Sequence, residues 1–73
     1  MITKADAIEI ARGRAAQKGW SFVEPVDLLE RRAWSGTVSR YEIETNAGKL
    51  GAKARFVVDA ATGSILSEGY VKR

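Results

Sequence analysis

The chain has 73 residues, a mass of 8.0 kDa and a formal net charge of +3. This length gives room for one small core, so we expect residues 1–73 to form one domain. Cysteine and histidine are both absent, which excludes a disulfide scaffold, a Cys/His zinc site, a thiol nucleophile and a histidine base. The composition therefore favours a small α+β domain that is not an enzyme and that holds no cofactor and no metal.

Positive charge is spread among acidic residues rather than gathered into one block. Segments 1–20, 21–35 and 36–73 carry +2, −1 and +2 respectively. Nucleic-acid binding usually needs a clustered basic face, so this pattern argues against it. No apolar run reaches the length of a membrane span, and the first six residues lack the basic-then-apolar layout of a signal peptide. We expect a cytoplasmic protein as the chain stands, and an exported or periplasmic one if a leader has been removed.

Residues 3–18 have the pattern of a helix that packs on a sheet. Thr3 is a good N-cap, Asp6 follows it at the spacing of a capping box, and Gly19 supplies a left-handed stop. Small and apolar residues recur at helical spacing along one stripe, namely Ala7, Ile8, Ala11 and Ala15. Because alanine allows a helix to lie close to its neighbours, this stripe predicts packing on strands. Trp20 is expected to pack over the end of this helix.

The stretch from residue 20 to residue 36 carries the weakest pattern. Residues 20–26 look extended, with Pro25 at an edge or a bend. We favour a strand for residues 26–34, because Pro25 precedes the stretch and the turn signal Ser35-Gly36 follows it. The helix propensity of residues 27–32 leaves a helix as the alternative.

Two later stretches alternate clearly and predict strands. In residues 37–45, one face carries Ser39, Tyr41, Ile43 and Thr45, and the other carries Val38, Arg40, Glu42 and Glu44. In residues 52–58, Ala52, Ala54, Phe56 and Val58 alternate with Lys53, Arg55 and Val57. Residues 46–49 are expected to form a turn between these strands.

The C-terminal part predicts a hairpin. In the loop 59–63, Asp59 can accept hydrogen bonds from backbone amides and Gly63 supplies a positive φ. Residues 64–71 are expected to form the last strand. The element order predicts an α+β fold, with a single N-terminal helix packed on one face of a three- to four-stranded antiparallel sheet.

Glu42 and Glu44 lie two residues apart on one strand and could resemble an acid/base pair. We interpret them instead as a solvated strand face that forms cross-strand ion pairs with Lys53 and Arg55. The serines have no histidine to activate them, and Gly48 and Gly51 lack the strand–loop–helix setting of a phosphate loop. We therefore predict no catalytic residue.

Aromatic and basic side chains come together in one group, and we take it as the candidate partner-binding surface: Arg31, Arg32, Trp34 and Arg40. Such a group could stack on a single-stranded base or dock an acidic peptide. Alternatively, Trp34 caps the edge of the core while the arginine stems cover apolar surface.

Three segments follow a known pattern in order. ITKADAIEIA at 2–11 fits an opening helix "I-s-x-x-x-A-i-x-i-A", YEIET at 41–45 fits a strand "Y-x-V", and FVVDAATGSIL at 56–66 fits a hairpin "v-x-V-D-a-x-T-G-x-v-l". Together they resemble the PepSY family, small α+β domains first described in peptidase propeptides. The chain departs from the family pattern in its long stretch 20–36, and in showing no leader where family members are usually exported or membrane-tethered.

The resemblance implies a non-catalytic module that binds or restrains a peptidase or another extracytoplasmic protein, and it supplies no catalytic residue. Two other hypotheses remain beside it. One is binding of single-stranded nucleic acid or an acidic ligand through the candidate surface. The other is a structural module that dimerises by pairing of edge strands.

Overall fold

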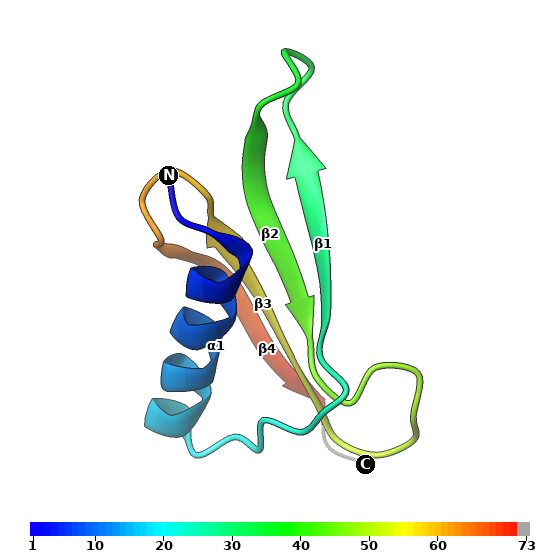
Figure 1. Cartoon of the computed structure of the whole chain (residues 1–73). Coiled ribbons are helices and arrows are strands. Elements are labelled where there is room, and N and C mark those ends of the chain that lie inside the picture. Colours follow the sequence, from blue (N-terminus) through cyan, green and yellow to red (C-terminus); the bar gives the residue numbers. More distant parts are fainter. Residues whose placement is uncertain (72–73) are drawn as a thin grey trace.

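A computed structural model describes residues 1–71 of the protein. One helix precedes four strands: α1 (Lys4–Lys18), β1 (Asp27–Arg32), β2 (Val38–Glu44), β3 (Lys53–Asp59) and β4 (Ile65–Val71). The strands pair in chain order, each antiparallel to the next, and α1 packs on one face of the sheet (Figure 1). The α+β fold with an N-terminal helix is therefore confirmed, with four strands. We call the sheet face opposite α1 the free face.

Both ends of α1 are fixed by the residues that the sequence indicates. The Thr3 hydroxyl accepts a hydrogen bond from the Asp6 N–H (3.1 Å), and the Asp6 carboxylate accepts one from the Thr3 N–H (3.0 Å). Gly19 takes a left-handed φ of 73° and donates to the Ala16 carbonyl (3.2 Å). Within residues 1–71, no helix has the length and apolar character needed to cross a membrane.

The alanine stripe of α1 lies directly on the sheet. Ala7, Ala11 and Ala15 have no exposed surface. The sheet side of the core is made by residues that the alternation placed on one face, chiefly Tyr41, Ile43, Ala54, Phe56 and Val58. Small side chains from the helix thus meet larger ones from the strands, which allows α1 to lie close to the sheet.

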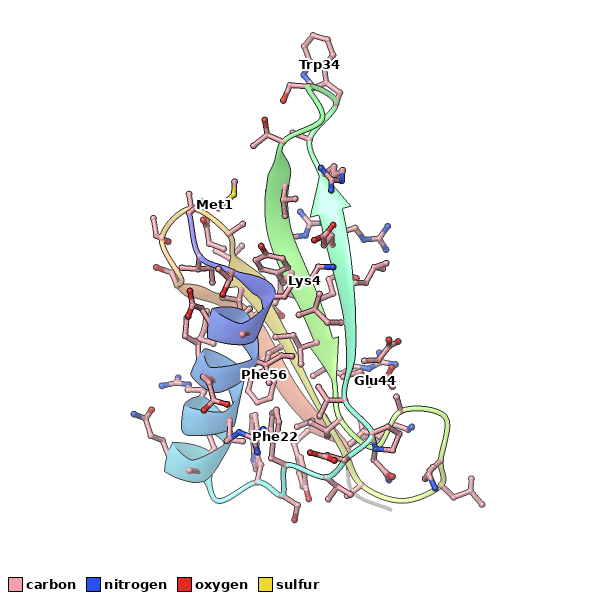
Figure 2. All side chains as sticks on the ribbon, viewed as in Figure 1. Met1, Lys4, Phe22, Trp34, Glu44 and Phe56 are labelled. Carbon is pink, nitrogen blue, oxygen red and sulfur yellow. The ribbon has the colours of Figure 1, made fainter. Side chains whose placement is uncertain are left out.

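An aromatic cluster closes the core near the C-terminal end of α1. The ring of Trp20 stacks on Tyr70, with centroids 5.4 Å apart and planes 7° from parallel, and lies 6.0 Å from Phe56. Phe22 packs against Phe56 at 6.5 Å, between the helix and the sheet (Figure 2). The expectation that Trp20 packs over the helix end is confirmed.

Residues 27–32 form strand β1, so the helical alternative for this stretch is wrong. Pro25 lies in a bend just before it, and the Glu24–Pro25 peptide is cis. Gly36, with a φ of 94°, lies in the turn that follows. Leu28 lies opposite Ile43 on the helix-covered face. The bend at Pro25, the turn at Gly36 and the core-facing side chain of Leu28 favour a strand, and together they outweigh the helix propensity of the segment.

The sequence predicted the loop after β3 correctly, and it predicted the loop after β2 only in part. In the loop after β3, Asp59 accepts hydrogen bonds from the N–H groups of Ala61 (2.7 Å) and Thr62 (3.1 Å), and Gly63 has a φ of 80°, as expected. The turn predicted at 46–49 is part of a longer loop, residues 45–52. The buried Asn46 explains the extra length, because its side-chain amide donates to two carbonyls further along this loop, at 3.1 and 3.2 Å.

Candidate partner-binding surface

The hairpin of β1 and β2 projects beyond the N-terminal end of α1 (Figure 1). Residues 33–36 form its tip, which we call the tip turn. Two backbone hydrogen bonds of 2.8 Å close this turn, from the Ala33 N–H to the Thr37 carbonyl and from the Gly36 N–H to the Ala33 carbonyl. The projecting end of the sheet is therefore an ordered turn rather than a loose loop.

Trp34 lies on the tip turn and points away from the rest of the molecule (Figure 2). Its side chain is fully exposed, with a relative accessibility of 102%. An indole usually buries 150–250 Å² of surface in a folded protein (a rough range). The alternative in which Trp34 caps the edge of the core does not fit this placement, and the ring is available for contact.

Arg32 ties the tip turn to β1. One guanidinium nitrogen, Nη1, donates to the Gly36 carbonyl at 2.8 Å, and Nη2 donates to the Glu30 carboxylate at 3.1 Å. Lys4 from α1 reaches the same carboxylate at 3.4 Å. Arg32 therefore acts inside the hairpin, on the side of the sheet that faces the helix.

Arg31 and Arg40 lie directly opposite each other on the free face of β1 and β2. Both reach Glu42, at 3.0 Å from Arg31 and 3.7 Å from Arg40. The hydrogen bond from Arg31 holds the pKa of Glu42 below its ordinary value, with a further contribution from the charge of Arg40. Part of the positive charge of this surface is thus compensated within the sheet.

The ion pairs on the free face differ in one respect from the sequence interpretation. Glu44 pairs with Arg55 at 3.3 Å and lies 3.9 Å from Lys53, as predicted. Glu42 does not pair with those residues. Its directly opposite neighbours are Leu29 and Val57, so its basic partners come from β1 and from its own strand.

The structure thus separates the four residues of the candidate surface. Arg31 and Arg40 lie together on the free face, Arg32 lies on the other side of the hairpin, and Trp34 stands at the tip. The cations that lie over aromatic rings within residues 1–71 are Arg12 and Lys18, on Phe22 and Trp20, and not those near Trp34. The binding role of the four residues stays a prediction.

A shallow groove of about 540 Å³ crosses the free face, and the sequence analysis did not anticipate it. Its lining comes from all four strands and includes Leu29, Glu42, Val57, Ser67 and Gly69. Gly69 has no side chain, and nothing lies within 4 Å of where its Cβ would be. A glycine in the interior of a strand often marks a place where another group can approach the backbone closely. Gly69 was therefore the feature of the sequence that could have indicated the groove.

A second feature missed by sequence analysis is the ion pair that joins α1 to β4. Arg14 donates to both carboxylate oxygens of Glu68, at 2.7 and 2.9 Å, and Lys18 lies 3.5 Å away. The hydrogen bond from Arg14 lowers the pKa of Glu68, and the same contact raises the pKa of Arg14. This cluster connects the layers and is a structural contact.

The side chains of the free face can make contacts and ion pairs. In the part of the chain that the structure describes, no three acidic side chains gather closely enough to hold a metal ion. Glu42 and Glu44 are each held by basic neighbours. The surface features that remain are an exposed indole, a groove and a ladder of ion pairs.

A protein-family model described as "Peptidase propeptide and YPEB domain" matches residues 1–68. The chain belongs to the PepSY family. The match runs from the N-terminus into β4, and so includes the three segments that carried the resemblance. PepSY domains are associated with peptidase propeptides and are regulatory rather than catalytic. No curated protein and no solved structure matches the chain.

Proposed function

We propose that this PepSY domain is a non-catalytic protein-binding module that restrains a peptidase, with the tip turn as the main contact. The observation that carries the proposal is Trp34, fully exposed at the end of a hairpin that projects past the helix-covered layer. Membership of a family associated with peptidase propeptides supports a peptidase as the partner.

The tip turn has the physical properties of a binding anchor. Tryptophan is enriched among the few interface residues that carry most of the binding energy. Two backbone hydrogen bonds and the contact from Arg32 to Gly36 already fix the turn in the free protein. Less conformational entropy is then lost on binding than for a flexible loop, which favours affinity.

The test compares inhibition by three forms of the domain. Each is added to the peptidase fraction of the source organism, and hydrolysis of a fluorescent casein is measured. We expect the wild-type domain to slow hydrolysis, and Trp34→Ala to weaken inhibition about 30-fold, which corresponds to about 2 kcal/mol. Leu50→Ala is the matched control, because Leu50 is also an exposed apolar side chain (91%) but lies in the loop 45–52.

Three outcomes would contradict the proposal. In the first, the wild-type domain leaves every peptidase activity of the fraction unchanged. In the second, Trp34→Ala inhibits as well as the wild type. Equal losses for Trp34→Ala and Leu50→Ala would show that the tip turn is not the specific contact.

Binding of single-stranded nucleic acid is less well supported. Arg31 and Arg40 already share Glu42, and Arg32 is held by Glu30 and Gly36, so fewer cations are free to meet phosphates. Ionic strength separates the two functions: each neutralised phosphate would add about one unit to the slope of log affinity against log salt. An interface centred on Trp34 should depend only weakly on salt.

A further inference from the structure

We propose that β1 is the interface of a two-fold symmetric homodimer, in which β1 of each copy pairs antiparallel with β1 of the other and Leu29 lies on the two-fold axis. The partner is a second copy of this chain. The proposal is independent of the contact assigned to the tip turn, because the paired residues are 27–31 and the turn comes after them.

The two edges of the sheet are not equivalent. Among the described residues, β1 is hydrogen-bonded along its backbone only to β2, so its outer edge is open. The irregularity between these strands leaves Ser39 of β2 as the extra residue, and β1 itself is regular. At the other edge the extra residue is Leu66, which lies in β4 itself. A bulge in the outer strand is a common device against edge-to-edge pairing, and β1 does not have one.

The free-face side chains of β1 are self-complementary in this arrangement. With Leu29 opposite the partner's Leu29, Asp27 lies opposite the partner's Arg31, and the same pair forms again across the axis. Asp27 takes part in none of the ion pairs within residues 1–71, and its neighbour on β2 is another acid, Glu44. Pairing with a second copy would give this carboxylate a cation. Leu29, 49% exposed in the single chain, would be covered by its counterpart.

The side chains of β1 on the helix-covered face are compatible with the same register. There, Leu28 lies opposite the partner's Glu30, whose carboxylate is already held by its own Arg32 (3.1 Å) and Lys4 (3.4 Å). Moving the axis to Glu30 would place two carboxylates against each other and Leu29 against the partner's Arg31. Shifting the pairing by a single residue would set residues whose backbone N–H and C=O groups point outward against residues whose groups point toward β2, so the hydrogen bonds between the two copies could not form. Charge and burial therefore favour Leu29 on the axis.

The dimer would have one continuous eight-stranded sheet with both helices on the same side. Asp27 and Leu29 line the groove of the free face at the β1 edge. In the dimer this edge lies at the two-fold axis, so the grooves of the two copies would join across it.

The absence of cysteine makes a clean crosslinking test possible. Side chains directly opposite each other in an antiparallel pair have Cβ atoms about 4.5–5.5 Å apart, close to the range that a disulfide spans. We expect Leu29→Cys to form a disulfide-linked dimer on mild oxidation at least about tenfold faster than Leu66→Cys, because pairing raises the effective thiol concentration. Leu66 is the matched control, since it is exposed to a similar degree (55%) on the opposite edge.

A charge-reversal experiment tests the register. We expect sedimentation equilibrium to show a dimer for the wild type and monomers for Asp27→Arg and for Arg31→Asp, each with opposed like charges. An equimolar mixture of the two variants should dimerise again, because each unlike pair is restored. If Arg31→Asp lowers the melting temperature through loss of its contact with Glu42, the mixture of Asp27→Cys and Arg31→Cys replaces it, and crosslinks should form only between the two variants.

The proposal is overturned if the wild type remains monomeric at concentrations up to about 1 mM. It is also overturned if Leu66→Cys crosslinks as fast as Leu29→Cys, or if the charge-reversed and cysteine mixtures both fail to associate. A wild type that is monomeric alone but binds an extended peptide from another protein along β1 would assign the same edge to a different occupant, and would likewise overturn the homodimer.

Discussion

Trp20 and Trp34 are the two tryptophans of the chain, and they lie in opposite environments. Trp20 stacks on Tyr70 and contacts the core at Phe56. Trp34 stands at the tip turn with its ring fully in solvent. The cost of truncating either ring depends on the area that it buries, so the same substitution separates a packing role from a binding role.

We predict that Trp34→Ala changes the free energy of unfolding by no more than about 0.5 kcal/mol, whereas Trp20→Ala lowers it by about 2 kcal/mol. Thermal and urea melts followed by circular dichroism measure both. A large loss of stability in Trp34→Ala would show that the ring packs against the protein, and would remove the basis for the tip turn as an anchor.

Arg32 holds the tip turn through the Gly36 carbonyl. We predict that Arg32→Ala leaves the melting temperature nearly unchanged, since the ion pair is exposed, but increases the backbone mobility of residues 33–36 in heteronuclear NOE measurements. Arg31→Ala is the control, because Arg31 contacts Glu42 on the free face and not the turn. Equal NOE values in wild type and Arg32→Ala would show that the two backbone hydrogen bonds hold the turn alone.

At the scale of elements, short-range chemistry explains why so much of the fold could be predicted. The capping box of Thr3 and Asp6, the stop at Gly19 and the turn residues Asp59 and Gly63 act over a few positions, and all are found as expected. The loop 45–52 could not be predicted in the same way. Its length depends on the burial of Asn46, which tertiary packing decides.

Two glycines provide a matched pair of tests within these elements. Gly63 has a φ of 80°, and a Cβ there would lie 3.1 Å from the Cδ1 atom of Ile10. Gly13 lies within α1 with open space around it. We predict that Gly63→Ala lowers the free energy of unfolding by about 1 kcal/mol and that Gly63→Val lowers it further. Gly13→Ala should raise it by about 1 kcal/mol, since alanine favours helix.

Urea melts of the three variants check these signs. Unchanged stability of Gly63→Val would show that the loop can adopt another conformation without cost. A destabilised Gly13→Ala would show that the exposed side of α1 makes a contact at this position.

At the scale of the whole molecule, contacts between distant segments are the features that could not be predicted from the sequence. Arg14 and Glu68 are 54 positions apart, and no local pattern connects them. The four residues of the candidate surface were close in sequence, yet the alternation of β1 sends Arg31 and Arg32 to opposite faces, and Trp34 lies beyond the strand in the tip turn. Sequence identified which residues could bind, and only the register shows which of them can act together.

The link between α1 and β4 makes stability depend on pH. The pKa of Glu68 is lowered from an ordinary value of 4.5 by the hydrogen bond from Arg14, and the pKa of Glu42 is lowered by Arg31. A carboxyl whose pKa is lower in the folded state stabilises that state above its unfolded pKa, and this contribution is lost as the pH falls through the folded value. Protonation of Glu68 weakens the contact between α1 and β4, whereas protonation of Glu42 weakens a contact on the free face.

We therefore predict that the wild-type melting temperature is level between about pH 6 and 7 and falls below about pH 4.5. Glu68→Gln should melt lower at pH 7, because it cannot form the charged pair with Arg14, and its melting temperature should fall less than that of the wild type between pH 5 and 3 (approximate limits). Glu24→Gln is the control, because Glu24 forms none of the ion pairs within residues 1–71, and it should keep the wild-type profile. Parallel curves for wild type and Glu68→Gln would show that the contact between Arg14 and Glu68 does not couple the helix to the sheet.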